Sequence, residues 1–216
     1  MEIFSLGATT EAGYSIPMAI VDFLPVLFYF LASWTIAKDL YGKVSKNAYS
    51  FLAAGSLMCF IGGAMKAVWK LLFCFGINYP YFFTALFPMQ APGFCLYFAG
   101  LIMALRQLRV KKEEGLNVVA ATVTTSLPMI MFQTIGSVGS LVCMAIFAGR
   151  KKDTLAIVYF ILGICGLLGM GCLGAILDSS LSWANWLEQG VNLVGQVFFY
   201  LGALRLHKKG YEEFCN

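Results

Sequence analysis

Ionisable side chains stand inside long apolar stretches of this 216-residue chain, where charge is costly and normally serves a purpose. They are Asp22, Lys66, Lys70 and Glu188. A carboxylate and an ammonium group at one depth in an apolar interior can form an ion pair, and a buried carboxyl can exchange protons. Amide side chains, which both donate and accept hydrogen bonds, occur in similar stretches at Gln90, Gln133, Gln189 and Asn192.

The elements that must position these residues are apolar helices. Hydrophobic residues make up 60% of the chain and charged residues 12%, and the mean hydropathy is +0.78, too little charge for the surface of a soluble domain. Only helices and closed barrels satisfy their backbone groups in lipid, and these runs are too long for barrel strands. We therefore predict one all-α membrane domain, a polytopic helix bundle. The expected spans are 14–37, 48–72, 81–105, a region within 113–148, 154–177 and 183–205.

The basic residues predict how these spans are oriented. Apart from the two lysines already named, every Lys and Arg lies in four separators, 38–46, 106–112, 150–152 and 205–209. Lys and Arg favour cytoplasmic loops, which predicts an N terminus outside and a cytoplasmic C terminus.

With that orientation, the region 113–148 must cross the bilayer twice. A short linker helix at 113–126 and a further span from Pro128 give seven transmembrane helices. The alternative is six helices in an inverted 3+3 arrangement, with two basic clusters outside.

The chain also contains a faint internal repeat. Ser15-Ile-Pro17-Met18 followed by Asp22 returns as Ser126-Leu-Pro128-Met129 followed by Gln133. We interpret 14–106 as repeat 1, 113–126 as the linker helix and 127–206 as repeat 2, two parallel three-helix units.

This plan resembles, in architecture, the 3+1+3 heptahelical group of SWEET sugar transporters, PQ-loop proteins and microbial rhodopsins. The resemblance implies a seven-helix membrane bundle of two three-helix repeats joined by a linker helix. The chain departs from these families in its motifs: it has methionine where a Pro-Gln dipeptide would stand, at Pro17-Met18 and Pro128-Met129, and its span 183–205 has no lysine to anchor retinal.

Counting from the basic clusters places the polar residues at one depth. Asp22 lies 16 residues before Lys38, and Gln90 lies 16 before Arg106, or about 24 Å from the inner face at ~1.5 Å per residue. We expect a pocket in the outer half of the bilayer, in which Asp22 or Glu188 pairs with Lys66, whereas Lys70 extends to the outer headgroups. The expected ligand-binding residues are Asp22, Lys66, Gln90, Gln133, Glu188, Gln189 and Asn192.

The sequence favours a transporter or channel for a small polar solute or ion, with proton coupling through Asp22 or Glu188. One alternative is a membrane-embedded enzyme that uses Asp/Glu acid–base chemistry on a lipid-like substrate. Another is a ligand sensor or accessory subunit. The lipid bilayer is the expected partner, and there is no basic patch of the kind that binds nucleic acid. The lone histidine, His207, lies in the basic tail and the cysteines lack CxxC spacing, so no catalytic residue, metal site or cofactor is predicted.

Overall fold

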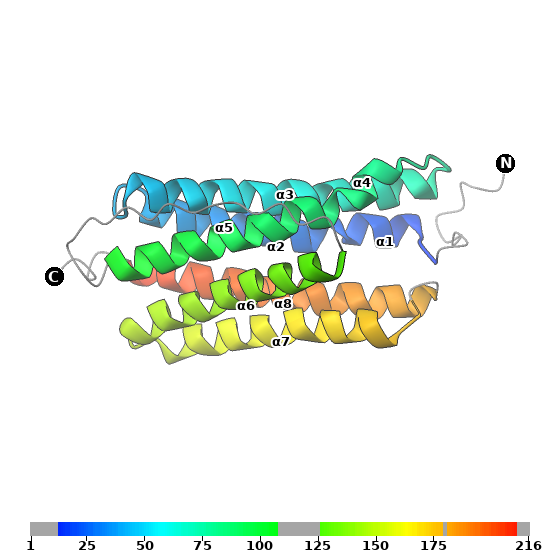
Figure 1. Cartoon of the computed structure of the whole chain (residues 1–216). Coiled ribbons are helices and arrows are strands. Elements are labelled where there is room, and N and C mark those ends of the chain that lie inside the picture. The colour runs from blue at the N-terminus through cyan, green and yellow to red at the C-terminus, as the bar shows by residue number, and fades with distance from the viewer. Residues whose placement is uncertain (1–12, 108–125, 179–180, 211–216) are drawn as a thin grey trace.

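The computed structural model describes residues 13–107, 126–178 and 181–210 (Figure 1). The regular elements in these ranges are all helices. They are α1 (Ile16–Val21), α2 (Phe23–Leu40), α3 (Lys46–Cys74), α4 (Pro80–Thr84), α5 (Leu86–Gln107), α6 (Ser126–Arg150), α7 (Thr154–Ile176) and α8 (Ser182–Lys209). The linker helix expected at 113–126 lies outside the described residues except for Ser126, where α6 begins.

Five of the helical stretches are long and apolar enough to cross a bilayer, which makes the chain a multi-pass integral membrane protein. They are Ile16–Leu40, Lys46–Cys74, Pro80–Gln107, Met129–Arg150 and Thr154–Ile176. The bounds agree within a few residues with those predicted from hydropathy. The sixth long helix, α8, has 28 residues but is less apolar because of side chains such as Glu188 and Asn192.

Prolines explain why two spans are built from a short helix and a long one. The first span is interrupted at Asp22, three residues before Pro25, and the third at Ala85, three residues before Pro88. A proline ring collides with the carbonyl four residues earlier and has no N–H to donate to it. The first interruption lies at Asp22, a carboxylate of the predicted site.

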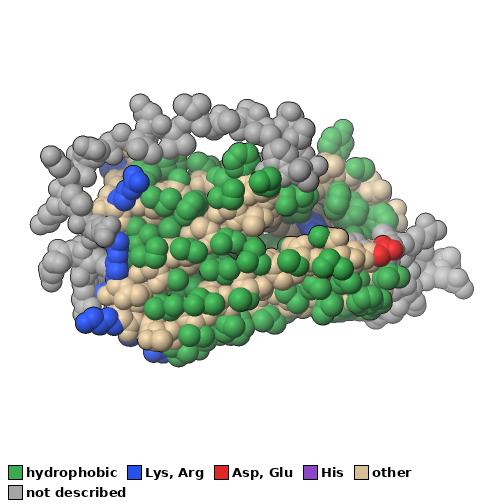
Figure 2. All heavy atoms as spheres, turned by 60° about the horizontal axis from the view of Figure 1, so that its bottom comes forward, with side chains coloured by type: hydrophobic (Ala, Val, Ile, Leu, Met, Phe, Trp, Pro, Cys, Tyr) green, Lys and Arg blue, Asp and Glu red, His purple; other side chains and the backbone are tan. Residues whose placement is uncertain are grey.

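The six long helices form a closed ring. Around this ring α2 packs on α3, α3 on α5, α5 on α6, α6 on α7, α7 on α8, and α8 on α2. Figure 1 shows that α2, α5, α6 and α8 run toward one end of the bundle while α3 and α7 run toward the other. We call the end at which α2, α5, α6 and α8 finish the basic end. On the face shown in Figure 2 most lysine and arginine side chains gather there.

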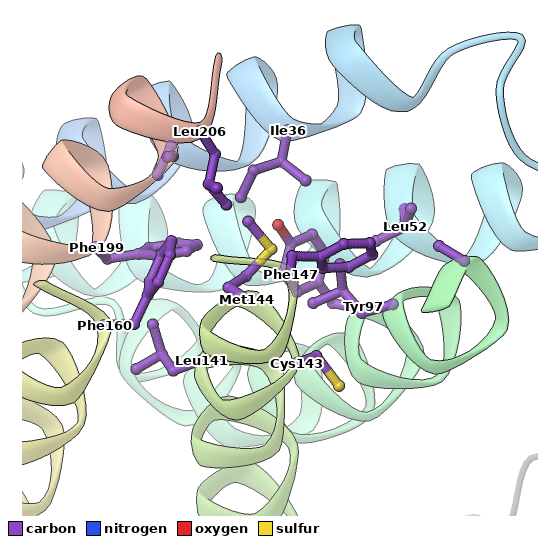
Figure 3. Packing of buried hydrophobic residues seen from close by; sticks show 14 of the residues in the cluster. Ile36, Leu52, Tyr97, Leu141, Cys143, Met144, Phe147, Phe160, Phe199 and Leu206 are labelled. Atoms are coloured by element: carbon purple, nitrogen blue, oxygen red, sulfur yellow. The ribbon is translucent and has the colours of Figure 1, made fainter. Parts of the chain in front are cut away.

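The tightest apolar packing lies toward the basic end. Its fully buried side chains include Ile36, Tyr97, Met144, Phe147 and Leu206, which converge from four helices around the bundle axis (Figure 3). Phe160 and Phe199 join α7 to α8 in the same cluster, with their ring centroids 6.4 Å apart. Nearest the basic end, Ile36, Phe147 and Leu206 are at most 1% exposed.

Hydrogen bonds and ion pairs join the helix ends at the basic end, and we call each of these groups of contacts a clasp. Ser45, the N-cap of α3, is held by Gln107, whose Oε1 accepts from the Ser45 N–H at 2.7 Å. Asp153, the N-cap of α7, accepts from Arg205 Nε at 2.8 Å and pairs with Lys209 Nζ at 3.3 Å. In each case a polar residue at the end of one helix satisfies the start of another.

The Asp153 clasp predicts a pH-dependent stability. Desolvation alone would raise the pKa of the Asp153 carboxyl, but hydrogen bonds from Arg205, the Ala156 N–H and Lys209 lower that pKa below its ordinary value of 3.8. The contribution of the carboxylate is therefore complete above the ordinary pKa and is lost as the pH falls through the lowered value. Thermal unfolding in detergent from pH 7 to pH 3 should show Asp153→Asn less stable than the parent at neutral pH, with the difference shrinking in acid. A difference independent of pH would contradict the role of the charge.

Glycines allow the closest helix contacts. A Cβ placed on Gly55 of α3 would stand 2.4 Å from the backbone N of Tyr97 in α5, and one on Gly166 of α7 would stand 2.6 Å from the Cα of Gly195 in α8. Small residues let backbones approach in this way and drive association where lipid supplies no hydrophobic force between helices. Gly171, in the same helix as Gly166, has nothing within 4 Å.

This difference predicts opposite effects of one added methyl group. Gly55→Ala should destabilise the protein by about 1–3 kcal/mol, because the α3–α5 backbones must separate. Gly171→Ala is the matched control and should be neutral or slightly stabilising, because alanine favours a helix by up to about 1 kcal/mol. Thermal unfolding in one detergent measures both, and equal effects would refute the close-contact explanation.

Candidate functional site

A buried ion pair joins the interruption of the first span to α3. Asp22 Oδ2 lies 3.1 Å from Lys70 Nζ, and their side chains are 8% and 3% exposed. Lys70 Nζ also stands 5.3 Å from the centre of the Tyr14 ring, a distance at which an aromatic face attracts a cation. The charges thus satisfy one another in a place that is nearly closed to solvent.

This pair corrects two expectations about the lysines. The prediction that Lys70 reaches the outer headgroups is wrong, because its ammonium is directed inward to the Asp22 carboxylate. The predicted pairing of Asp22 with Lys66 is wrong for the same reason. Lys66 is half-buried and makes no ion pair with any described residue. Both Lys66 and Glu188 lie close enough to act electrostatically on Lys70.

Two of the predicted glutamines form a bridge across three helices. Gln133 Nε2 of α6 donates to Gln90 Oε1 of α5 at 3.1 Å, and Gln90 Nε2 donates to the Cys59 carbonyl of α3 at 3.3 Å. Interhelical hydrogen bonds of this kind contribute about 0.6–2 kcal/mol each in membranes. Gln90 and Gln133 therefore hold helices together, and Gln133 keeps one buried oxygen, Oε1, without a donor among the described residues.

Helix α8 presents a row of polar side chains with unused acceptors. The buried oxygens Oε1 of Glu188, Gln189 and Gln196 have no hydrogen-bond partner among the described residues. Gln189 is 7% exposed, and Glu188 faces α7, where its Oε1 would lie 3.9 Å from a Cβ on Gly174. A buried acceptor without a donor costs about 1–3 kcal/mol, so this face is suited to a ligand that brings donors.

A small cavity of about 20 Å³ lies among α2, α5, α6, α7 and α8, enough for one water molecule. The hydroxyls of Tyr29 and Tyr97, both buried, and Gln196 Oε1 have no partner among the described residues. Asn192 is the only predicted site residue in its wall. The lining residues are Tyr29, Phe94, Tyr97, Ser137, Ser140, Leu141, Gly163, Leu167, Asn192, Gly195, Gln196 and Phe199.

Apart from Asn192, the sequence reasoning missed the polar members of this wall, although a signal exists for three of them. Tyr29, Tyr97 and Gln196 each lie nine residues before the first basic residue at the end of their helix, Lys38, Arg106 and Arg205, or about 14 Å from the basic end. That level lies closer to the basic end than the predicted pocket.

The seven predicted site residues are thus not gathered into one pocket. They divide into Asp22, which pairs with Lys70, Lys66, which has no ion pair with a described residue, the amide bridge of Gln90 with Gln133, and the α8 face of Glu188, Gln189 and Asn192. The described residues include no group of three or more His, Cys, Asp or Glu side chains that could hold a metal ion.

Comparisons with protein-family models, curated proteins and solved structures find no match to this chain.

The ion pair makes a prediction about single and double substitutions. Asp22→Leu or Lys70→Met alone should destabilise the protein by about 3–5 kcal/mol, because each leaves the other charge buried and unpaired. The double variant should recover most of that loss, because neither charge of the pair remains. Thermal unfolding in detergent provides the double-mutant cycle, and additive losses would contradict the pairing.

Proposed function

We propose that this protein is a transporter or channel for a small polar solute or ion. The observation that carries the proposal is the division of the bundle interior. The ion pair, the amide bridge and the unused acceptors of α8 lie away from the basic end, while large apolar side chains such as Phe147 and Leu206 fill the interior beside it. A bundle whose interior is polar toward one end and filled by apolar side chains at the other has the polarity expected of a transporter that is closed on its basic side.

The proposed topology is seven spans, with α8 as the last and the region 113–126 as the linker, the N terminus outside and the C terminus cytoplasmic. The shared direction of α2, α5, α6 and α8 supports it, since both triplets, α2–α3–α5 and α6–α7–α8, then cross the membrane in the same sense. The gathering of Lys and Arg at one end supports the cytoplasmic assignment of that end.

The proposed route runs along the axis between the two triplets. Solute contacts would begin at Asp22, Lys66 and the α8 face of Glu188, Gln189 and Asn192, and continue to the central cavity beside Gln196. A cavity of about 20 Å³ excludes any solute larger than water, so passage requires the triplets to separate. Proton coupling would use Glu188, whose buried Oε1 accepts no hydrogen bond from a described residue.

Flux measurements with the purified full chain in liposomes test this function. A panel of labelled solutes (neutral polyols, zwitterions, small anions and small cations) should include at least one that crosses faster than in protein-free liposomes. Gln196→Leu should reduce that flux at least tenfold, because it removes an acceptor from the wall of the central cavity on the proposed route. Asp22→Asn, assayed at a temperature where it stays folded, should do the same.

The matched control is Thr134→Val, because the Thr134 hydroxyl bonds only to the Ile130 carbonyl of its own helix. Its flux should equal that of the parent. Flux equal to protein-free liposomes across the whole panel, or flux unchanged by Gln196→Leu, would overturn the proposal.

A further inference from the structure

A second hollow lies on the outside of the bundle, apart from the central cavity. It is a groove of about 620 Å³ between α5 and α6, within the size range of ligand pockets. Apolar side chains and one glycine form most of its walls, and an arginine from each helix stands at its end. The lining residues are Phe98, Ile102, Leu105, Arg106, Gly139, Val142, Cys143, Ile146 and Arg150.

The groove lies where lipid tails meet headgroups. Two of the apolar spans, Pro80–Gln107 and Met129–Arg150, end at or one residue beyond its arginines. Arg106 and Arg150 therefore stand at the boundary of the hydrocarbon layer. The walls face outward, since Val142 is 43% and Ile146 is 45% exposed. From Gly139 to Arg150 the groove follows α6 for about 16 Å.

The two arginines retain free donors. Arg150 donates a hydrogen bond from one guanidinium nitrogen to the Leu105 carbonyl at 3.2 Å, which joins α6 to α5. Its other guanidinium N–H groups remain available. Neither Arg106 nor Arg150 pairs with a carboxylate of the described residues. Two guanidinium groups without a carboxylate partner among the described residues attract an anion at a membrane surface, and guanidinium groups bind phosphate through paired hydrogen bonds.

We propose that this groove binds one anionic phospholipid, with an acyl chain along the apolar walls and the phosphate between Arg106 and Arg150. The charge of the site selects this occupant. A second copy of the chain docked by the same face would bring four arginines together, and like charges at such an interface repel. A zwitterionic lipid offers the same chain but adds a cation next to the arginines.

Lipid titration of the purified full chain in detergent tests the proposal by native mass spectrometry. The probes are phosphatidylglycerol, phosphatidylcholine with the same acyl chains, and glycerol phosphate without chains. Phosphatidylglycerol should bind more tightly than phosphatidylcholine, and glycerol phosphate should not compete at equal concentration. The variant Arg106→Gln with Arg150→Gln should weaken phosphatidylglycerol binding roughly tenfold and leave phosphatidylcholine unchanged.

Two further variants separate the headgroup site from general charge. Lys38→Gln with Lys208→Gln removes the same charge from exposed positions at the same end, outside the groove, and should bind phosphatidylglycerol like the parent. Val142→Trp fills the groove while keeping both arginines, and should weaken the binding of both lipids. Equal affinity for the two lipids, competition by glycerol phosphate alone, or equal losses in the arginine and lysine variants would each overturn the proposal.

Discussion

The interaction on which the interior depends is the ion pair of Asp22 and Lys70. Removing two charges from water costs several kcal/mol for each, and their mutual attraction offsets this only when geometry holds them together. The interruption before Pro25 places Asp22 at the junction of α1 and α2, and α3 brings Lys70 to within 3.1 Å of it. Once that carboxylate and that ammonium group have satisfied one another, Lys66 and Glu188 remain as the charges of the same region without an ion-pair partner among the described residues. On the proposed route, a solute could reach Lys66 and Glu188 without breaking an ion pair, whereas a contact with Asp22 would have to compete with Lys70.

The two triplets meet where α5 packs on α6 and where α8 packs on α2. We call these two interfaces the seams, and they differ in polarity. Where α5 meets α6, Gln90 and Gln133 close the seam with an amide–amide hydrogen bond. In the repeat predicted from the sequence, Asp22 stands in the place of Gln133. Gln189 stands in the place of Gln90, because each lies 16 residues before the arginine near the end of its helix, Arg205 and Arg106. Helix α8 packs on α2 as α5 packs on α6. That second seam contains a carboxylate already engaged by Lys70 and an amide whose oxygen has no donor among the described residues. The α5–α6 seam is thus neutral and keeps one unused acceptor, Gln133 Oε1, whereas the α2–α8 seam contains a charged group and keeps unused acceptors along α8. A solute with hydrogen-bond donors would form more hydrogen bonds at the α2–α8 seam.

Hydropathy and basic residues were sufficient to predict the helices, because a bilayer admits few alternatives to an apolar helix of about 20 residues. They were not sufficient to predict which lysine is buried. Lys66 and Lys70 stand one turn apart in the same apolar helix, and only the position of the first span decides that Lys70 meets Asp22. Likewise, Gly166 and Gly171 have the same sequence character, yet only Gly166 contacts a neighbouring helix. Depth follows from counting along a helix, whereas the direction of a side chain depends on which helix lies beside it, and a single sequence does not supply that.

The arrangement of polar contacts limits how the proposed triplets could separate. The contact of Ser45 with Gln107 and that of Asp153 with Arg205 each lie within one triplet, so they can move as parts of rigid bodies. Across the triplets at the basic end stand the pair of His207 with Asp39, at 2.7 Å, and the hydrogen bond from Arg150 to the Leu105 carbonyl. The His207 side chain is 46% exposed, and exposed pairs contribute about 0–1 kcal/mol. The proposed opening at this end is therefore opposed mainly by apolar contacts such as those of Phe147 and Leu206. These side chains would have to separate before the cavity beside Gln196 could connect to the basic end. The groove proposed to bind a lipid lies over the α5–α6 seam. A lipid bound between Arg106 and Arg150 would therefore hold α5 and α6 together and oppose the proposed separation of the triplets.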